Sequence, residues 1–130
     1  MAQVEKSEQE WRRELDPERY RILREKATEA PFSGEYDELF EPGTYRCAGC
    51  GTELFTSDAK YDSGCGWPAF SAPAAGEAVA EELDATHGMV RTEVLCASCG
   101  GHLGHVFPDG PAPTGQRYCI NSLALRFDER

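Results

Sequence analysis

The chain has 130 residues, of which 13 are basic and 23 acidic, so its formal net charge is −10. This length predicts one domain with its own core, and 40 % hydrophobic with 28 % charged residues is typical of a globular protein. The acidity argues against a nucleic-acid-binding protein, which needs a basic face to contact phosphates. No apolar run reaches the roughly 20 residues of a membrane span, and residues 1–10 contain no hydrophobic signal-peptide block, so we expect a cytoplasmic protein with no membrane partner.

The first 41 residues are dense in charge and predict two short helices. They carry 12 of the 23 acidic and 7 of the 13 basic side chains. Ser7 begins a Ser-x-x-Glu capping box, which predicts a helix over residues 8–15. Asp16 is a second N-cap candidate, because a proline follows it at the first helical position, and it predicts a helix over residues 17–26.

From residue 43 onward, short segments rich in β-branched and aromatic residues lie between glycines and prolines. Such segments predict strands. The expected strands are residues 44–47, 69–71, 79–83, 90–96, 105–107, 117–120 and 124–127. We therefore expect a mainly β protein with antiparallel pairing, in which residues 1–15 form a charged N-terminal arm and residues 16–130 form a single domain.

An internal repeat places four cysteines in two similar turns. Residues 47–54 and 96–103 are identical at five of eight positions, and each segment contains Cys-x-x-Cys-Gly. Two residues between thiolates let both sulfurs bind one ion at about 2.3 Å, and a following glycine can adopt the positive φ that turns the chain. The pattern predicts one structural zinc ion per chain, held by Cys47, Cys50, Cys96 and Cys99. Four thiolates leave no open position, so this ion is not expected to be the catalyst.

Two other interpretations of these four cysteines are structural disulfides and a redox-active Cys-x-x-Cys pair. Disulfides are less favoured because nothing in the sequence indicates secretion. A thioredoxin-like redox pair is less favoured because it belongs in a βαβ context, which the predicted elements lack.

The remaining thiols, Cys65 and Cys119, lie in different surroundings. Glycines flank Cys65, which predicts an exposed, flexible loop. Strand alternation would place Arg117, Cys119 and Asn121 on one face. A nearby cation lowers the pKa of a thiol, and Asn121 could donate a hydrogen bond to a substrate. The alternatives are that both thiols are inert core residues, or that this face is merely exposed to solvent.

Residues 101–110 contain two histidines among glycines that allow close approach of the backbone. His105 and Phe107 would share one strand face. His102 is not needed as a fifth metal ligand, because four cysteines fill the shell. A lone histidine is usually structural, but beside a nucleophilic cysteine it can donate or accept a proton near neutral pH. His87 is assigned to a turn.

Taken in order, the motifs resemble those of the B-type methionine sulfoxide reductases, which act on the R epimer. These motifs are Cys47-x-x-Cys50, Ser63-Gly-Cys-Gly-Trp-Pro68, His87-Gly-Met89, Arg91-Thr-Glu-Val94, Cys96-x-x-Cys99, Gly104-His-Val-Phe107, Asp109-Gly-Pro111 and Arg117-Tyr-Cys-Ile-Asn-Ser122. Each motif alone is weak, but the ordered set is specific, and the resemblance runs from about Asp16 to Phe127. It implies a β-tent-like fold of two antiparallel sheets, with the zinc remote from the active site.

The resemblance also implies the roles of the two remaining thiols. Cys119 is expected to be the nucleophile and to become a sulfenic acid as methionine leaves. Cys65 matches the recycling position, where it would form a disulfide with Cys119 that thioredoxin reduces. The family generally prefers peptide-bound methionine sulfoxide, and nothing in the sequence suggests an obligate oligomer, so we expect a monomer.

Other side chains are expected to bind the sulfoxide. Arg117 would favour the thiolate, while His105, assisted by His102 and Asn121, would hydrogen-bond the oxygen or give it a proton. Trp67 and Phe107 would form an apolar wall around the methyl group. The proton donor is left open among His102, His105, Asp109 and Arg117.

Two other functional classes are also considered. A non-catalytic zinc-binding interaction module of related fold would need neither Cys65 nor Cys119. A thiol peroxidase or disulfide oxidoreductase would use the same two thiols, but it would be expected to show a βαβ pattern.

Overall fold

The computed structural model describes residues 6–85 and 88–129, so the turn predicted around His87 lies outside the described residues. The elements in these ranges are α1 (Glu8–Glu14), α2 (Pro17–Glu25), β1 (Gly43–Cys47), β2 (Glu53–Thr56), β3 (Lys60–Tyr61), β4 (Ala69–Phe70), β5 (Val79–Asp84), β6 (Arg91–Cys96), β7 (His102–Phe107), β8 (Arg117–Ile120) and β9 (Leu125–Glu129). No helix in these ranges is long and apolar enough to span a bilayer.

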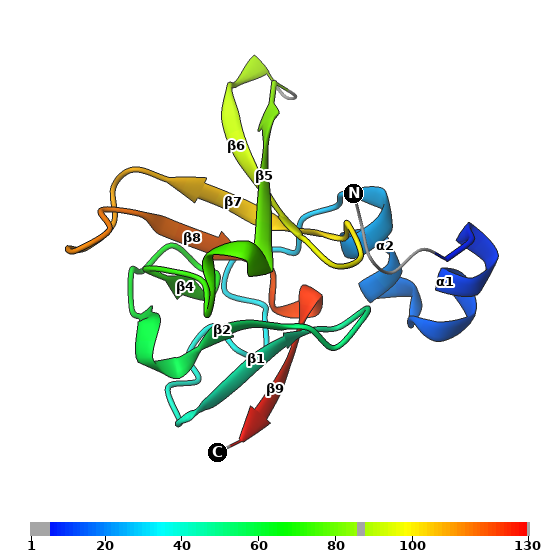
Figure 1. The fold of residues 1–130 in the computed structure, drawn as a ribbon, viewed down its shortest axis with the longest axis horizontal. Coiled ribbons are helices and arrows are strands. Elements are labelled where there is room, and N and C mark those ends of the chain that lie inside the picture. The colour runs from blue at the N-terminus through cyan, green and yellow to red at the C-terminus, as the bar shows by residue number, and fades with distance from the viewer. Residues whose placement is uncertain (1–5, 86–87, 130) are drawn as a thin grey trace.

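The strands form two antiparallel sheets (Figure 1). The smaller has the order β2-β1-β9 and the larger has the order β3-β4-β8-β7-β6-β5. In the larger sheet, β8 lies between β4 and β7, so Cys119 is paired with Ala69 on one side and His105 on the other. This register sets a cysteine and a histidine side by side in the middle of a sheet. The predicted mainly β fold with two antiparallel sheets is confirmed.

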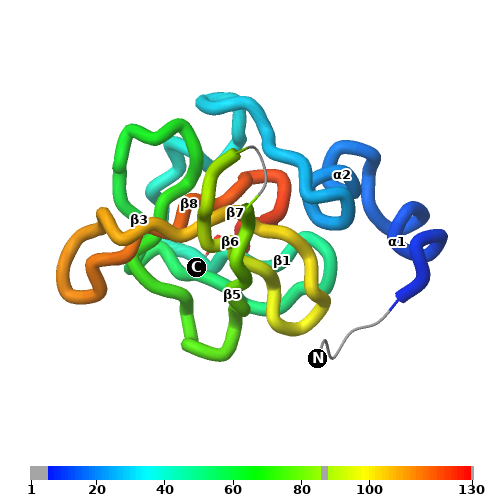
Figure 2. Tube along the Cα trace, turned by 90° about the horizontal axis from the view of Figure 1, so that it is seen from above, coloured from blue at the N-terminus to red at the C-terminus, as the bar shows by residue number. Residues whose placement is uncertain are grey.

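Both predicted helices are present, and their starts follow the expected capping. The Ser7 hydroxyl accepts a hydrogen bond from the Glu10 N–H, and the Glu10 carboxylate accepts one from the Ser7 N–H. Asp16 caps α2 by accepting a hydrogen bond from the Arg19 N–H. Figure 2 shows the two helices together at one end of the molecule, beside the strands.

An aromatic cluster fills the space between the sheets. Phe55 and Phe70 stack with their ring centroids 4.4 Å apart, and Tyr45 contacts both Phe70 and Phe127 at about 5 Å. Tyr45, Phe55 and Phe70 are fully buried. Each such side chain stabilises the fold by roughly 1.5–3 kcal/mol relative to an exposed one, so these rings hold the two sheets together.

Three strands differ most from the prediction, while the ends of several others differ by one or two residues. The short strands β2 and β3 were not predicted, because turn-forming residues surround them. β7 begins at His102 rather than at residue 105, since the glycines there are part of the strand. A Cβ on Gly104 would lie 2.1 Å from the Cys119 carbonyl oxygen, so this glycine lets β8 approach closely.

The proposed boundary between an arm and a domain at residue 15 stays a prediction. Trp11, in the middle of α1, is buried, and the Arg24 guanidinium of α2 lies 4.7 Å from the centre of its ring. A Cβ on Gly49 would lie 3.2 Å from the Trp11 ring. The first helix therefore packs against the turn that carries the first two cysteines of the repeat.

Candidate functional site

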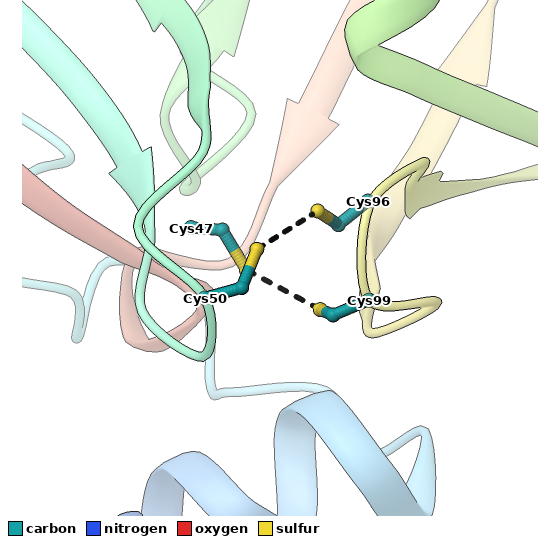
Figure 3. A group of neighbouring side chains, drawn as sticks. All are labelled: Cys47, Cys50, Cys96 and Cys99. Carbon is teal, nitrogen blue, oxygen red and sulfur yellow. Dashed lines mark hydrogen bonds between the residues drawn. The ribbon is translucent and has the colours of Figure 1, made fainter. Parts of the chain in front are cut away.

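Four cysteine side chains converge from two turns (Figure 3). Cys47 and Cys96 are the last residues of β1 and β6, and Cys50 and Cys99 lie in the turns that follow these strands. The Sγ atoms of Cys47 and Cys99 are 3.7 Å apart, and those of Cys50 and Cys96 are 3.6 Å apart. All four sulfurs lie within 4.8 Å of one another. A tetrahedral ion with bonds of about 2.3 Å to sulfur needs sulfur–sulfur separations of about 3.8 Å. The four-cysteine cluster therefore fits a tetrahedral metal ion, as the repeat predicted.

The two turns of the cluster have the same backbone geometry. Gly51 and Gly100 follow the second cysteine of each turn, with φ angles of 81° and 77°. Their N–H groups donate to the carbonyl oxygens of Cys47 and Cys96, each at 2.8 Å. Since residues other than glycine rarely adopt such φ values, the glycines of the repeat are required by the turn, and the predicted chain reversal is confirmed.

Hydrogen bonds among the four thiols of the cluster shift their pKa values in opposite directions. Hydrogen bonding with Cys47 holds the pKa of Cys50 far below its ordinary value and lowers the pKa of Cys96 to about 7. Hydrogen bonding with Cys50 and burial raise the pKa of Cys47. The cluster thus already favours some thiolate, the form that binds a metal ion.

The other two thiols face each other across 3.4 Å between their Sγ atoms. Cys119 lies on β8, whereas Cys65 lies in a loop between Gly64 and Gly66, which have φ angles of 74° and 95°. The Cys65 thiol also donates to the Trp67 carbonyl oxygen at 3.2 Å. Disulfide formation would bring the two sulfurs to about 2.05 Å, so only a small movement is needed.

A cavity of about 280 Å³ opens beside this pair. It is lined by Thr28, Cys65, Trp67, Arg91, Gly104, His105, Phe107, Arg117, Cys119 and Asn121. Seven of these are predicted site residues. Arg91 and Gly104 appear in the sequence analysis only within motifs, with no role assigned, and Thr28 is not named there. The predicted residues His102 and Asp109 do not line the cavity.

The protonation of the two thiols differs from the expectation. Burial raises the pKa of Cys119, and the charge of Cys65 raises it further. Arg117 lowers this pKa, as predicted, but its effect is outweighed, so the expected net lowering is wrong. Burial also opposes ionisation of Cys65, but hydrogen bonding with Ser63 and with Cys119, together with the charge of Arg117, lowers the pKa of Cys65 below its ordinary value. In the resting pair, the thiolate is therefore favoured on Cys65.

Arg117 is held from two sides at the edge of the cavity. Its guanidinium donates to both Asp109 carboxylate oxygens, at 2.9 and 3.2 Å, and lies 4.5 Å from the centre of the Phe107 ring. The Arg117 guanidinium in turn lowers the pKa of Asp109. Asp109 thus orients a cation of the cavity from outside it.

The main chain of Glu29 fixes two side chains of the cavity. Its N–H donates to the Asn121 side-chain oxygen at 3.0 Å, and its carbonyl accepts a hydrogen bond from the Trp67 indole at 3.0 Å. The Asn121 amide group also donates to the Leu103 carbonyl at 2.9 Å. Asn121 is buried, so its side chain helps to hold the loop that carries Trp67 against the sheet.

Each histidine is paired with a buried carboxylate. The distance is 2.8 Å from His105 Nε2 to Asp84 and 2.7 Å from His102 Nδ1 to Glu93. The two imidazole rings are 5.5 Å apart, so His102 lies behind His105 as seen from the cavity. Burial lowers the pKa of His102, which favours its neutral form.

The sequence did carry a signal for some of the missed residues. Arg91 and Glu93 alternate along β6, so both point to the face that bears the histidines, and the Arg-Thr-Glu motif contains both. Asp84 had no such signal, because it follows Glu81 and Glu82 on the same strand and resembles these exposed acids.

Comparison with known proteins supports one family. Residues 15–129 match the SelR domain family. The chain is 67 % identical over 127 residues to the peptide methionine sulfoxide reductase MsrB of Bradyrhizobium diazoefficiens, which covers 98 % of this chain and 91 % of that protein. It is 61 % identical over 127 residues to the protein of the same name from Hahella chejuensis, with the same coverage. For the Acinetobacter baumannii protein the identity is 59 % over 126 residues, covering 97 % and 91 %.

Proposed function

The chain belongs to the SelR-domain family, the B-type methionine sulfoxide reductases, and from that premise we propose that it reduces methionine (R)-sulfoxide, mainly in proteins, to methionine. The observation that carries the proposal is the pair of thiols 3.4 Å apart at the wall of a cavity of about 280 Å³. The name of the relatives specifies a peptide substrate, which supports protein-bound methionine sulfoxide.

Cys119 is the proposed nucleophile. Its sulfur attacks the electrophilic sulfoxide sulfur, while the sulfoxide oxygen takes up a proton. The oxygen then passes to Cys119 as the sulfur–oxygen bond of the substrate breaks, which leaves a sulfenic acid on the enzyme and releases methionine. Before the attack, the Cys119 proton can pass to the neighbouring Cys65 sulfur, which is 3.4 Å away.

Cys65 is the proposed recycling residue. The Cys65 thiol gives up its proton as its sulfur attacks the sulfur of the Cys119 sulfenic acid. The disulfide forms, the sulfur–oxygen bond of the sulfenic acid breaks, and the leaving hydroxide takes up the proton to depart as water. An external dithiol, which we propose is thioredoxin, then reduces this disulfide by exchange. The position of Cys65 in a glycine-flanked loop supports attack on the Cys65 sulfur, since Cys119 lies within the sheet.

The remaining predicted residues have proposed roles that follow from their placement. His105 faces the cavity and is the proposed donor of the proton to the sulfoxide oxygen, and Arg117 supplies a fixed positive charge nearby. Trp67 and Phe107 form the proposed apolar wall for the methyl group. His102, Asp109 and Asn121 are proposed to hold these groups in place, and Asn121 also reaches the cavity.

We also propose that the four-cysteine cluster holds one zinc ion. Four thiolates around one ion leave no open position, so the ion would join the β1–β2 and β6–β7 loops and take no part in the reaction. We propose a monomer, because the proposed reaction uses two thiols and a cavity that a single chain supplies, and thioredoxin-dependent recycling supports a reducing compartment such as the cytoplasm.

Turnover on the separated R and S epimers of a peptide methionine sulfoxide, with a small dithiol as reductant, tests the proposed function. We expect the R epimer to be reduced and the S epimer to be left intact, because one apolar wall accepts the methyl group from one side. Equal rates on both epimers would contradict the stereochemical assignment. No reduction of either epimer by a folded, reduced protein would favour a non-catalytic module.

A further inference from the structure

Lys26 ends helix α2 in a conformation that lysine rarely adopts. Its φ and ψ angles are 61° and 32°, in the left-handed region where helices usually place glycine. Any residue with a Cβ is strained there, so the chain carries a lysine where glycine would fit with less strain. Because strained conformations persist where the surrounding contacts require them, the φ of Lys26 indicates a role for its side chain.

The Lys26 ammonium lies between the two carboxylates that contact the histidines. Its Nζ atom is 3.1 Å from Glu93 Oε1 and 3.5 Å from Asp84 Oδ1. The second oxygen of each carboxylate contacts an imidazole, Asp84 Oδ2 that of His105 and Glu93 Oε2 that of His102. One cation from a helix end is thus linked through two buried acids to both histidines.

We propose that Lys26 is a positioning residue for sulfoxide reduction, which holds Asp84 and Glu93 so that His105 is oriented toward Cys119. The inference rests on the proposed function, in which His105 acts on the substrate. Lys26 itself does not line the cavity, so it acts through the carboxylates. Without its ammonium, Asp84 would keep the Arg91 guanidinium 3.4 Å away, but Glu93 would lose the cation that pairs with it at 3.1 Å. The position of the Glu93 carboxylate relative to Asp84 would then no longer be fixed by a shared charge.

The hydrogen bonding of His102 indicates which form of the ring this arrangement selects. His102 Nε2 is buried and has no hydrogen-bond partner in the described part of the chain, whereas Nδ1 contacts Glu93. A neutral ring that donates from Nδ1 leaves only a lone pair unpaired at Nε2. The Glu93 carboxylate therefore fixes the tautomer of His102, and Lys26 fixes the carboxylate.

The charges around the histidines give a directional test. The charged and titratable groups around His102 are Glu93, Lys26 and His105. His105 contacts Asp84, which also pairs with Arg91. Arg117 and both thiols lie around the same cavity. Burial lowers the pKa of His102, and the positive charge of Lys26 lowers it further. Removing that charge should raise the pKa of His102, so a limb of the pH profile that depends on the histidine pair should move to higher pH.

The main variant is Lys26→Gly, because glycine accepts a φ of 61° and keeps the backbone of the helix end. Relief of the backbone strain at this φ partly offsets the lost ion pairs, so we expect the unfolding temperature to fall by only a few degrees. We expect kcat to fall about tenfold and KM to change by less than about twofold. Lys26→Arg, which keeps a cation, should recover most of kcat. Lys6→Gly is the matched control, since Lys6 pairs with Glu14 at the other end of the helical region, and it should change neither parameter.

Imidazole nitrogen NMR supplies a readout that needs no turnover. In the unmodified chain we expect His102 protonated at Nδ1, and in Lys26→Gly we expect an upward shift of its titration. An unchanged kcat and titration in a folded Lys26→Gly variant would overturn the proposal. So would a fall in kcat matched by an equal fall in stability with no change in titration. Absence of sulfoxide turnover in the unmodified chain would instead count against the proposed function, because the NMR result is independent of it.

Discussion

The four-cysteine cluster and the Cys65–Cys119 pair place the same side chain in opposite surroundings. In the cluster, two rigid turns with matching glycines bring four sulfurs around one point, and Cys47, Cys96 and Cys99 are buried. In the pair, a loop and a central strand bring two sulfurs together, and both are partly exposed beside a cavity.

The difference shows how the number and access of thiols decide their chemistry. Four sulfurs enclose a position of tetrahedral geometry, which suits a bound ion and leaves no site for a substrate. Two sulfurs leave one side open, where His105, Arg117 and Trp67 face the same space. If the two groups differ in this way, replacing a thiol of the cluster should reduce stability first, and replacing a thiol of the pair should reduce turnover first.

Replacing Cys119 should have the largest effect on activity. In Cys119→Ser we expect turnover to fall by at least about 10³-fold, as occurs when a nucleophile is removed, because a hydroxyl cannot form the sulfenic intermediate. The free energy of unfolding should change by less than about 1 kcal/mol. Steady-state reduction of a peptide (R)-sulfoxide and denaturant unfolding measure the two quantities. Substantial activity in this variant would mean that another residue is the nucleophile.

Replacing a thiol of the cluster should produce the opposite pattern. Structural zinc sites contribute apparent binding free energies of about 10–16 kcal/mol, which is comparable to the whole stability of a domain. In Cys99→Ser we therefore expect loss of the metal and of stable folding before any specific loss of chemistry. Metal analysis and thermal unfolding of the purified protein check this. A folded, metal-free Cys99→Ser variant with the unfolding temperature of the unmodified chain would remove the structural role.

Replacing Cys65 should stop recycling, and it should slow but not prevent the first turnover, because the Cys119 proton loses its acceptor 3.4 Å away. Cys65→Ser is expected to release one methionine per chain and then stop when thioredoxin is the reductant, because no disulfide forms. Small thiols should partly restore turnover by reducing the sulfenic acid directly. Rapid-quench measurement of the first turnover, compared with steady-state cycling, separates the two steps. If this variant cycled with thioredoxin at the full rate, Cys65 would be a passive loop residue.

Features that depend on local pattern could be predicted from the sequence. The capping box that starts α1 joins Ser7 and Glu10, which are three residues apart. Each Cys-x-x-Cys-Gly turn is made by five consecutive residues. Both were predicted correctly because their partners are close in sequence. The pairing of the two turns followed because four thiols suit one tetrahedral ion.

Features that depend on packing could not be predicted. Asp84 and Glu82 are acids on the same strand, but only the sheet register shows that Asp84 meets His105. The contacts of Lys26 with Asp84 and Glu93 join positions far apart in the chain. The sign of the Cys119 pKa shift also depends on burial, which outweighs the cation two residues away.

The order of alkylation tests the electrostatics of the pair. The thiolate is the reactive form of cysteine, and the pKa lies below its ordinary value for Cys65 and above it for Cys119. At neutral pH, the thiolate fraction is therefore larger on Cys65, and iodoacetamide should label it before Cys119. If the four-cysteine cluster holds zinc as proposed, its thiols should be labelled last. Peptide mass spectrometry over a time course gives the order, and prior labelling of Cys119 would mean that Arg117 outweighs burial.

The smallest effect is expected from Asp109, which supports the cavity from its edge. The Asp109 side chain is exposed, and exposed ion pairs contribute little because solvent screens them. Losing the two hydrogen bonds to Arg117 in Asp109→Asn should therefore lower kcat/KM by no more than about fivefold. Because Arg117 lowers the pKa of Asp109, the pair stays ionised throughout the neutral range, and this loss of kcat/KM should not vary with pH there.

Asp128→Asn is the matched control. Asp128 forms an exposed pair with Arg46 at the other sheet, so this variant should leave kcat/KM unchanged. Equal small losses in both variants would show that Asp109 contributes only surface charge, whereas a loss confined to Asp109→Asn would tie the orientation of Arg117 to the reaction at Cys119.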